Sequence, residues 1–282
     1  NTLQVQELNL SQVAEAASYI EMLHKASIII DDMIDSDDAR HGKKAFHAEF
    51  GRDKAVIFAL ALLGKGSAGI NDIFQRTKSS HQSVALYSQT IYRMATGCLE
   101  ELELNPLSRY DTERVRRIID LETISLIKNS LLLGYWSNSG TELSMEQAVI
   151  EIGENCGYIF QILNDLEPFS SAEKNSAYKG SWNMDLDRDR KNIAVAYIYG
   201  AASKREKQLL TSLSGEELCS LVLELYKKHS IYQEICDEAR ELEQQTDDLI
   251  STLCRSGRPA GSLDDFRIFV HEMVEICFSK LG

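Results

Sequence analysis

The sequence predicts an all-α protein, and three observations support this fold class. Apolar residues recur at helical spacing along most of the chain, for example over residues 20–30, 56–63 and 121–131. Only 3 prolines and 16 glycines interrupt the 282 residues, so few positions break a helix. No stretch shows the sustained alternation of apolar and polar residues that is typical of strands. We therefore expect helices of ordinary length that pack as a bundle.

The breaks between the expected helices are short, with one exception. They fall at residues 36–46, 64–70, 105–111, 137–144, 168–185 and 256–263. We find no internal repeat, and expect residues 1–282 to form one helical domain. The longest break follows Glu167, and a long loop in a compact domain is more often a lid or binding loop than filler. The first residue is Asn1, which leaves open an N-terminal piece that is missing or processed.

Composition excludes some classes of partner. The formal net charge of -13 repels nucleic-acid phosphates and anionic membrane surfaces, and the small basic groups at 40–44 and 188–191 form no broad basic face. We expect no nucleic-acid partner. The 6 cysteines include no Cys-x-x-Cys pair, which favours a reduced, cytoplasmic compartment. We see no signal peptide and no apolar run long enough to span a bilayer, so we expect no transmembrane segment.

The strongest local pattern is an aspartate cluster that directly follows the apolar residues 26–30. Asp31 and Asp35 are one helical turn apart and share a face, with Asp32 beside them. Carboxylates this close repel each other and favour a bound cation, and hard oxygen ligands suit Mg²⁺ that bridges to a diphosphate. A solvated helix end is the alternative interpretation. The basic stretch at 40–44 follows immediately, and cationic side chains beside a metal are what a diphosphate leaving group requires.

At this point the sequence resembles the trans-isoprenyl diphosphate synthase (polyprenyl synthetase) family. The family has an Asp-Asp-x-x-Asp helix, a short loop, two arginines with a glycine, a histidine and a Phe-Gly pair. Within residues 20–51 this chain has, in the same order, Asp31, Asp32, Asp35, Arg40, His41, Gly42, His47, Phe50 and Gly51. Further matches are Lys128 in ETISLIKNS, Gln161 in GYIFQILNDLEPF and the basic loop at 185–192. The resemblance runs from about residue 15 to 200.

The resemblance implies a helical bundle of the isoprenoid synthase type with a central cavity for the prenyl tail. It also implies a Mg²⁺-dependent prenyltransferase that ionises an allylic prenyl diphosphate, with Mg²⁺ as the cofactor. The implied site residues are catalytic Asp31, Asp32, Asp35 and Lys128; metal-binding Asp31, Asp32, Asp35, Asn164 and Asp165; and diphosphate-binding Arg40, Lys128, Gln161, Lys179 and Lys191.

The chain departs from the family pattern at several positions. His41 stands where the family has a second arginine that helps to bind isopentenyl diphosphate, so His41 marks the acceptor site. The second aspartate motif reads Asn164-Asp165-Leu166-Glu167-Pro168, in which Asp165 alone keeps its register. Where the family has a Lys-Thr pair, this chain has Lys128-Asn129. The family's Gly-Lys-Arg motif would lie upstream of Asn1.

These departures change the expected chemistry of the second site. Gln161 and Asp165 are four residues apart on one helix face, and Asn164 can still offer a carbonyl oxygen to a metal. We expect looser binding of one Mg²⁺ here. The loop residues Lys179, Arg188, Arg190 and Lys191 would close over the diphosphate, although a solvated charged turn is the alternative.

Four functions remain open from the sequence. In the first, the protein elongates an allylic diphosphate with isopentenyl diphosphate, and in the second it joins the allylic group to a non-isoprenoid acceptor such as an aromatic ring. In the third it is a class I terpene cyclase, and in the fourth it is a non-catalytic subunit that modulates a synthase. The cyclase motif needs Ser or Thr at 168 and Glu at 172, where this chain has Pro168 and Ala172. The intact first cluster with Arg40 and Lys128 disfavours the non-catalytic subunit.

Two further expectations concern chain length and assembly. Ser27 and Ala26, four and five residues before Asp31, are small, whereas bulky aromatic residues at these positions in the family stop the chain at fifteen carbons or fewer. We therefore expect a prenyl chain of fifteen to twenty carbons unless Phe58 or Tyr92 fills the pocket. Close helix packing is the alternative reason for small residues here. By analogy with the family we expect a homodimer, although the sequence does not distinguish it from a heterodimer.

Overall fold

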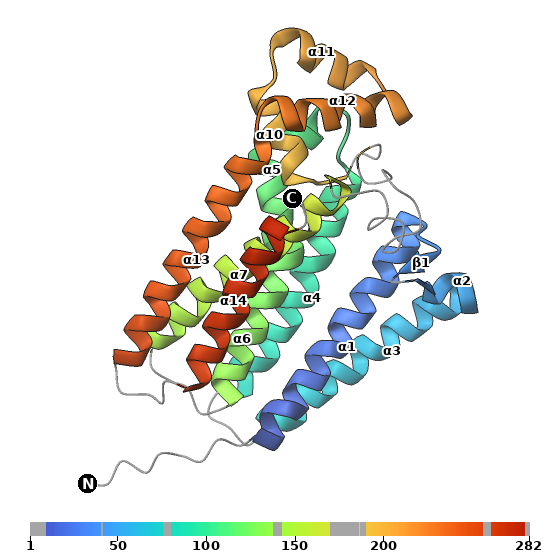
Figure 1. Cartoon of the computed structure of the whole chain (residues 1–282). Helices are drawn as coiled ribbons and strands as arrows, with labels where there is room; N and C mark the ends of the chain where they lie inside the picture. Colours follow the sequence, from blue (N-terminus) through green and yellow to red (C-terminus); the bar gives the residue numbers. More distant parts are fainter. Residues whose placement is uncertain are drawn as a thin grey trace.

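The described part of the chain is an α-helical bundle, as the sequence predicts (Figure 1). The computed structural model describes residues 10–40, 42–75, 80–137, 143–169, 186, 190–255 and 261–279. The longer helices are α1 (Leu10–Asp35), α3 (Arg52–Phe74), α4 (Ser80–Leu102), α6 (Ser125–Ser137), α7 (Leu143–Leu166), α12 (Gly215–Lys228), α13 (Ile231–Arg255) and α14 (Gly261–Ser279). The shorter elements are β1 (Ala39–Arg40), β2 (Lys43–Lys44), α2 (Phe46–Phe50), η1 (Ser108–Tyr110), α5 (Thr112–Ile119), η2 (Asp120–Ile124), η3 (Glu167–Phe169), α10 (Ile193–Ala201) and α11 (Lys204–Ser212).

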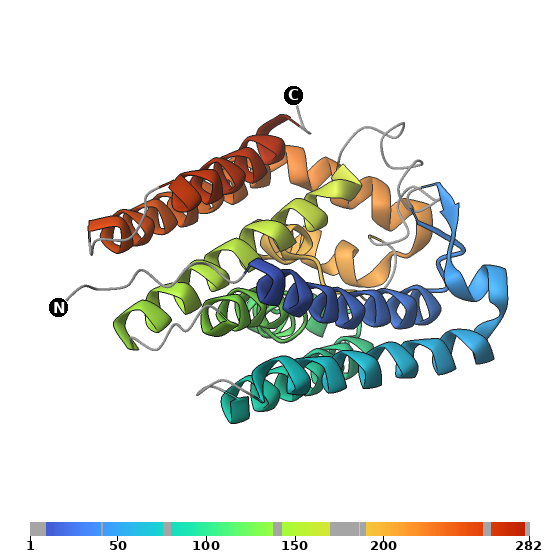
Figure 2. The ribbon, with the colours of Figure 1, turned by 90° about the horizontal axis from the view of Figure 1, so that it is seen from below.

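The long helices run side by side, as the two views in Figures 1 and 2 show. α1 packs along α3 at one edge of the bundle, α6 packs along α7, and α13 and α14 pack against each other and against α7. α11 and α12 lie across one end. The hairpin of β1 and β2 and the short helix α2 lie near the C-terminal end of α1, where the aspartate cluster is.

Two glycines let α7 approach η2 and α6 closely. A Cβ atom at Gly153 would lie 2.6 Å from the Cα of Lys128, and one at Gly157 would lie 2.8 Å from the Cα of Ile124. Real Cβ atoms do not come this close to a neighbouring backbone, because the atoms would overlap. Glycine at these positions therefore fixes the distance between α7 and the segment that carries Glu122, Thr123 and Lys128.

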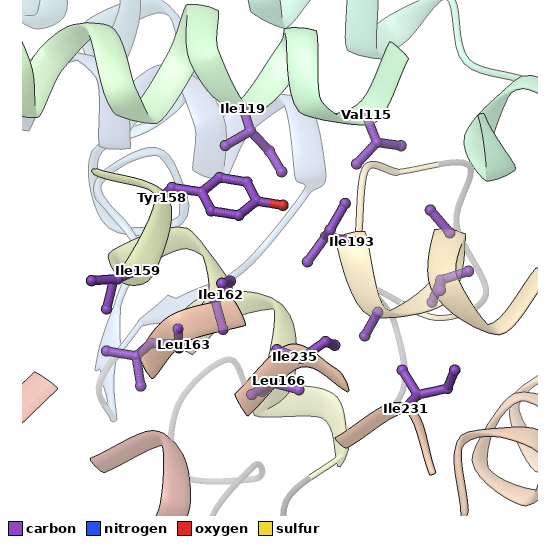
Figure 3. Close-up of a cluster of buried hydrophobic side chains, with 14 of the residues drawn as sticks. Val115, Ile119, Tyr158, Ile159, Ile162, Leu163, Leu166, Ile193, Ile231 and Ile235 are labelled. Carbon is purple, nitrogen blue, oxygen red and sulfur yellow. The ribbon is translucent and has the colours of Figure 1, made fainter. Parts of the chain in front are cut away.

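A large apolar cluster holds α5, α7, α10 and α13 together (Figure 3). Figure 3 shows Ile119 of α5, Ile162 of α7, Ile193 of α10 and Ile235 of α13 converging on one region. All four side chains are fully buried, and burying each contributes roughly 1.5–3 kcal/mol. This packing seats the N-terminus of α10 against α7, close to Asp165.

The helix α3 carries an exposed apolar face. Val56, Ile57, Phe58 and Leu60 are all exposed there. By length and composition alone α3 could cross a membrane, and most of this helix is exposed. Our expectation that no apolar run is long enough for a span was therefore wrong for this helix, because Arg52 to Phe74 forms one uninterrupted helix through its glycines. The absence of a transmembrane segment stays a prediction.

Candidate active site

The C-terminal end of α1 presents the three aspartates of the first cluster. Ser36 follows in a left-handed conformation (φ 57°), which ends the helix, and the chain turns back through the hairpin of β1 and β2. Gly42 has φ 72°, a conformation that favours glycine in a tight turn. The hairpin brings Arg40 onto the cluster, 2.8 Å from Asp32 Oδ1 and 3.1 Å from Asp31 Oδ2.

The two neighbouring aspartates differ in their surroundings. The side chain of Asp31 is 49% exposed, whereas Asp32 is buried. Burial raises the pKa of Asp32 above its ordinary value, although Arg40 opposes this shift. Asp31 is therefore available to a ligand from solvent, and Asp32 orients the guanidinium of Arg40.

A second group of cations faces the cluster from the residues that precede α10. Arg190 forms an ion pair with Asp35 of α1. Lys191 forms an ion pair with Glu122 of η2, and its Nζ lies 3.3 Å from Glu101 Oε1 at the end of α4. Residues from four separate segments of the chain thus meet in one charged cluster, which we call the acid-base cluster: Asp31, Asp32, Asp35, Arg40, Glu101, Glu122, Arg190 and Lys191.

Burial and mutual charge shift the pKa values of Lys191 and its two glutamate partners. Burial alone would lower the pKa of Lys191, but Glu101 and Glu122 raise it well above its usual value, so Lys191 stays charged. Burial raises the pKa of Glu122 to about 7, against the effect of Lys191. Burial would also raise the pKa of Glu101, but Lys191 and Arg190 lower it overall. Lys191 is therefore a permanent cation with Glu101 as its charged partner.

The second motif is organised around Asp165, which is buried. Its Oδ1 accepts a hydrogen bond from Gln161 Nε2 at 2.6 Å, and its Oδ2 accepts one from the backbone N–H of Ile193 at 2.7 Å. Burial raises the pKa of Asp165 to about 6, although these two donors oppose the shift. Asn164, by contrast, is exposed. The structure thus joins Asp165 and Gln161 as the sequence predicts, and adds the N-terminus of α10 to them.

Gln161 connects this motif to the π-helical turn η2. Thr123 Oγ1 donates to Gln161 Oε1 at 2.5 Å. We matched the family's Lys-Thr pair to Lys128-Asn129, whereas the threonine that contacts Gln161 in this structure is Thr123. Such π-helical turns are frequent at functional sites.

The structure does not bring every predicted residue to the acid-base cluster. Lys128 Nζ donates to Glu154 Oε1 of α7 at 2.7 Å. Ala26 is fully buried against Ala55 and Ala59 of α3, and Ser27 is half-buried. The rings of Phe58 and Tyr92 are exposed, at 43% and 72%. His41 and Lys179 lie outside the described residues.

The sequence interpretation missed Glu101, Glu122 and Thr123. Glu101 lies in the run Glu100-Glu101-Leu102-Glu103, in which nothing distinguishes the buried carboxylate from the other two. The weak signal for Glu122 and Thr123 was their place in ETISLIKNS, the stretch we already matched to the family.

The donor set of the first cluster fits Mg²⁺. Among the described residues no three His, Cys, Asp or Glu side chains converge as a ready-made metal site. Mg²⁺, however, is usually bound through one or two carboxylates together with substrate phosphates, and it retains several waters. Asp31 and Asp35 are carboxylates one turn apart at the end of α1, which suits a cation shared with a diphosphate.

Comparison with known proteins supports the family. Residues 1–228 match the polyprenyl synthetase family. The chain is 25% identical over 218 residues to the short chain isoprenyl diphosphate synthase of Methanocaldococcus jannaschii, covering 77% of this chain but 64% of that protein. It is 25% identical over 258 residues to heptaprenyl diphosphate synthase component 2 of Bacillus subtilis, covering 91% of this chain and 72% of that protein.

The solved structures agree on the fold. Geranylgeranyl pyrophosphate synthetase from Pyrococcus horikoshii Ot3 superposes with a TM-score of 0.77 at 21% identity, covering 94% of this chain and 80% of that one. The names of these relatives are those of prenyl diphosphate synthases, and the chain spans just under two thirds of the first of them. The matched family and the all-α fold lead to one conclusion: this chain belongs to the polyprenyl synthetase family.

Proposed function

We propose that the protein is a Mg²⁺-dependent prenyltransferase that ionises an allylic prenyl diphosphate at Asp31, Asp32 and Asp35. The single observation that carries this proposal is the acid-base cluster, in which Arg40 and Arg190 pair with these aspartates and Lys191, paired with Glu101 and Glu122, follows Arg190. Loss of diphosphate places negative charge on the leaving group, and fixed cations around it stabilise that charge. The names of the relatives support the same reaction class.

The side chains of the cluster have distinct tasks in this reaction. The chemistry that Mg²⁺ supplies, when bound at Asp31 and Asp35, is neutralisation of the diphosphate oxygens. Arg40, held in place by Asp32, presents a planar set of donors that suits a phosphate. Arg190 lies against Asp35 and can exchange this carboxylate for a phosphate oxygen. Lys191, paired with Glu101 and Glu122, adds a buried positive charge on the same side.

The acceptor is either isopentenyl diphosphate or a non-isoprenoid molecule. His41 in place of an arginine and Asn164 in place of an aspartate favour an unusual acceptor, whereas the names of the relatives favour isopentenyl diphosphate. The test is to incubate the protein with Mg²⁺, isopentenyl diphosphate and each allylic diphosphate of five, ten, fifteen or twenty carbons, and to analyse the products by mass. Elongated diphosphates support the first acceptor. Cyclic hydrocarbons support a cyclase, and no product in any mixture supports a non-catalytic subunit or another acceptor.

We propose that the chain accepts or makes a prenyl tail of fifteen to twenty carbons, and that Ser27 lies on the tail side of α1. Leu23, Ser27 and Asp31 share one helix face, and Leu23 belongs to the apolar cluster between α1, α4, α6 and the C-terminal end of α3. Ala26 instead faces α3, so its small size serves close packing there.

Replacing Ser27 with phenylalanine is expected to shorten the longest tail by about one isoprene unit, because the benzyl group occupies the space next to the cluster. The measurement is the product or substrate length by mass spectrometry. Ala26→Phe is the matched control. It is expected to cost roughly 1–3 kcal/mol of stability through overpacking against α3. If Ser27→Phe left the chain length unchanged, or if wild type handled only five- and ten-carbon chains, the tail assignment would be wrong.

We further infer that the protein is a homodimer that pairs through the exposed apolar faces of α3 and α4. Ile57, Leu60, Tyr92 and Leu99 are exposed apolar or aromatic residues on these two helices, which pack against each other. Large exposed apolar patches mark interaction surfaces.

We also propose that the protein is cytoplasmic. The five cysteines that the structure describes are free thiols, which fits a reducing compartment.

Light scattering at micromolar concentration is expected to give about twice the chain mass for wild type and the chain mass for Ile57→Glu, because a charge would be buried at the interface. Leu143→Glu, at an exposed leucine at the start of α7, is the control and should leave the mass unchanged. A monomeric wild type would refute the dimer.

A further inference from the structure

The residues that enter α10 are anchored at several points along the chain. Buried Arg109 donates to the backbone oxygen of Leu186 at 3.0 Å. Asn192 caps α10 by accepting from the N–H of Val195, and its amide donates to the backbone oxygen of Asp165 at 2.8 Å. The N–H of Ile193 donates to the Asp165 carboxylate. The backbone that carries Arg190 and Lys191 is therefore fixed on its C-terminal side by α7.

One carboxylate also binds this pair directly. Glu101 Oε1 accepts from the backbone N–H of Lys191 at 3.0 Å and lies 3.3 Å from its Nζ, and Glu101 Oε2 lies 3.7 Å from Arg190 Nη1. Glu101 is only 6% exposed, and it reaches this pair from the last turn of α4, about 90 residues earlier in the chain. One side chain thus contacts the main chain and both cations.

Burial of such a carboxylate gives little stability. Taking a charge out of water costs several kcal/mol, and a buried ion pair often does no better than apolar residues of the same size. Glu101 and Lys191 lie beside Arg190, which in turn contacts Asp35 of the aspartate cluster. Glu101 contacts Arg190, and Arg190 pairs with Asp35, a predicted metal ligand. This location indicates that Glu101 helps to arrange the site.

We propose that Glu101 is the positioning residue that holds Arg190 and Lys191 toward the aspartate cluster, so that both cations receive the diphosphate. This proposal rests on the proposed function. Glu101 contacts no substrate group itself and acts through the two basic residues. Without its carboxylate, the ends of both side chains and the N–H of Lys191 lose a shared acceptor, and the pair no longer faces Asp35 in one arrangement.

The direction in which diphosphate affinity changes when Glu101 is replaced distinguishes a positioning role from a purely electrostatic one. Glu101 is an acid near a site for an anion, so removing its charge would by itself strengthen the binding of a diphosphate. Loss of positioning has the opposite effect and weakens binding. A role in stability alone would change the unfolding temperature and leave both the affinity and the ratio of KM to kcat unchanged.

The test measures binding of inorganic pyrophosphate with Mg²⁺ by calorimetry, and KM and kcat with an allylic diphosphate. Glu101→Gln removes the charge, whereas Glu101→Asp keeps the charge but shortens the reach by one methylene. Both variants are expected to bind pyrophosphate about tenfold more weakly, the effect of one charge-assisted hydrogen bond, with KM raised more than kcat is lowered. Glu100→Gln is the matched control. Glu100 precedes Glu101 on α4 and pairs with the exposed Arg117, so its replacement should leave affinity within about twofold.

Each outcome has a distinct meaning. If both Glu101 variants match the Glu100→Gln control, or if Glu101→Gln binds pyrophosphate more tightly than wild type, the positioning role is overturned. If Glu101→Gln does not fold, Glu101→Asp, which keeps the negative charge, decides the question. If wild type itself binds no Mg²⁺-pyrophosphate and turns over no allylic diphosphate, the proposed function fails as well. Normal turnover in wild type with unaffected Glu101 variants overturns the positioning role alone.

Discussion

Replacing Asp31 with asparagine is expected to lower turnover about a thousandfold, equivalent to about 4 kcal/mol of lost transition-state stabilisation. The carboxylate is half-exposed at the end of α1 and faces the solvent side of the cluster with Arg40. Asparagine keeps the shape but loses the charge that holds a cation against the leaving diphosphate. Initial rates at saturating allylic diphosphate and Mg²⁺ give the measurement.

The stability of Asp31→Asn should be close to that of wild type, since an exposed side chain of the same size is replaced. Asp38→Asn is the control. This aspartate lies just beyond the cluster, its side chain is 89% exposed, and its replacement should change turnover by less than about twofold. Near-normal Mg²⁺-dependent turnover in Asp31→Asn would remove the first cluster from the mechanism.

Replacing Lys191 with methionine is expected to cost about 3–5 kcal/mol of stability, the typical effect of breaking a buried ion pair. Methionine fills a similar volume but leaves Glu101 and Glu122 as two neighbouring buried acids without their shared cation. The free energy of unfolding from denaturant titration gives the measurement. Turnover should also fall, because the variant removes one of the cations that face the leaving group.

Lys128→Met provides a matched comparison on a second lysine. Lys128 pairs with Glu154, whose side chain is 43% exposed and can return to solvent when the lysine is lost. We expect a loss of about 1 kcal/mol or less and little change in turnover. A larger loss of turnover in Lys128→Met than in Lys191→Met would restore the role that the family resemblance implies for Lys128.

The fold and the first cluster were predictable because their signals are local. Helical periodicity and scarce helix breakers are properties of neighbouring residues, and the structure confirms the all-α prediction. Asp31 and Asp35 lie within one turn of one helix, and the hairpin that returns Arg40 to them closes within ten residues. A short connection leaves few arrangements open, so a sequence pattern is enough to find this part of the site.

The remaining contacts depend on which faces are turned toward each other by helices that lie far apart in the sequence. Glu101 and Lys191 are 90 residues apart, and no local pattern marks their contact. The π-helical turn at 120–124 winds with more residues per turn, so it shifts the faces of all later residues on that helix, including Lys128. Asp165 of α7 accepts from the N–H of Ile193 at the start of α10, although these residues are 28 positions apart in the chain. Adjacent Ala26 and Ser27 likewise face different neighbours, because successive helical positions differ by about 100°.

Release of diphosphate from an allylic substrate tests the proposed chemistry most directly. Purified protein is incubated with fifteen- and twenty-carbon allylic diphosphates, in Mg²⁺ and in EDTA, with and without isopentenyl diphosphate, and the liberated pyrophosphate is quantified. We expect release that requires Mg²⁺ and that falls about a thousandfold in Asp31→Asn. Absence of release from these and the shorter allylic diphosphates, or release that neither EDTA nor Asp31→Asn reduces, would contradict ionisation at the aspartate cluster.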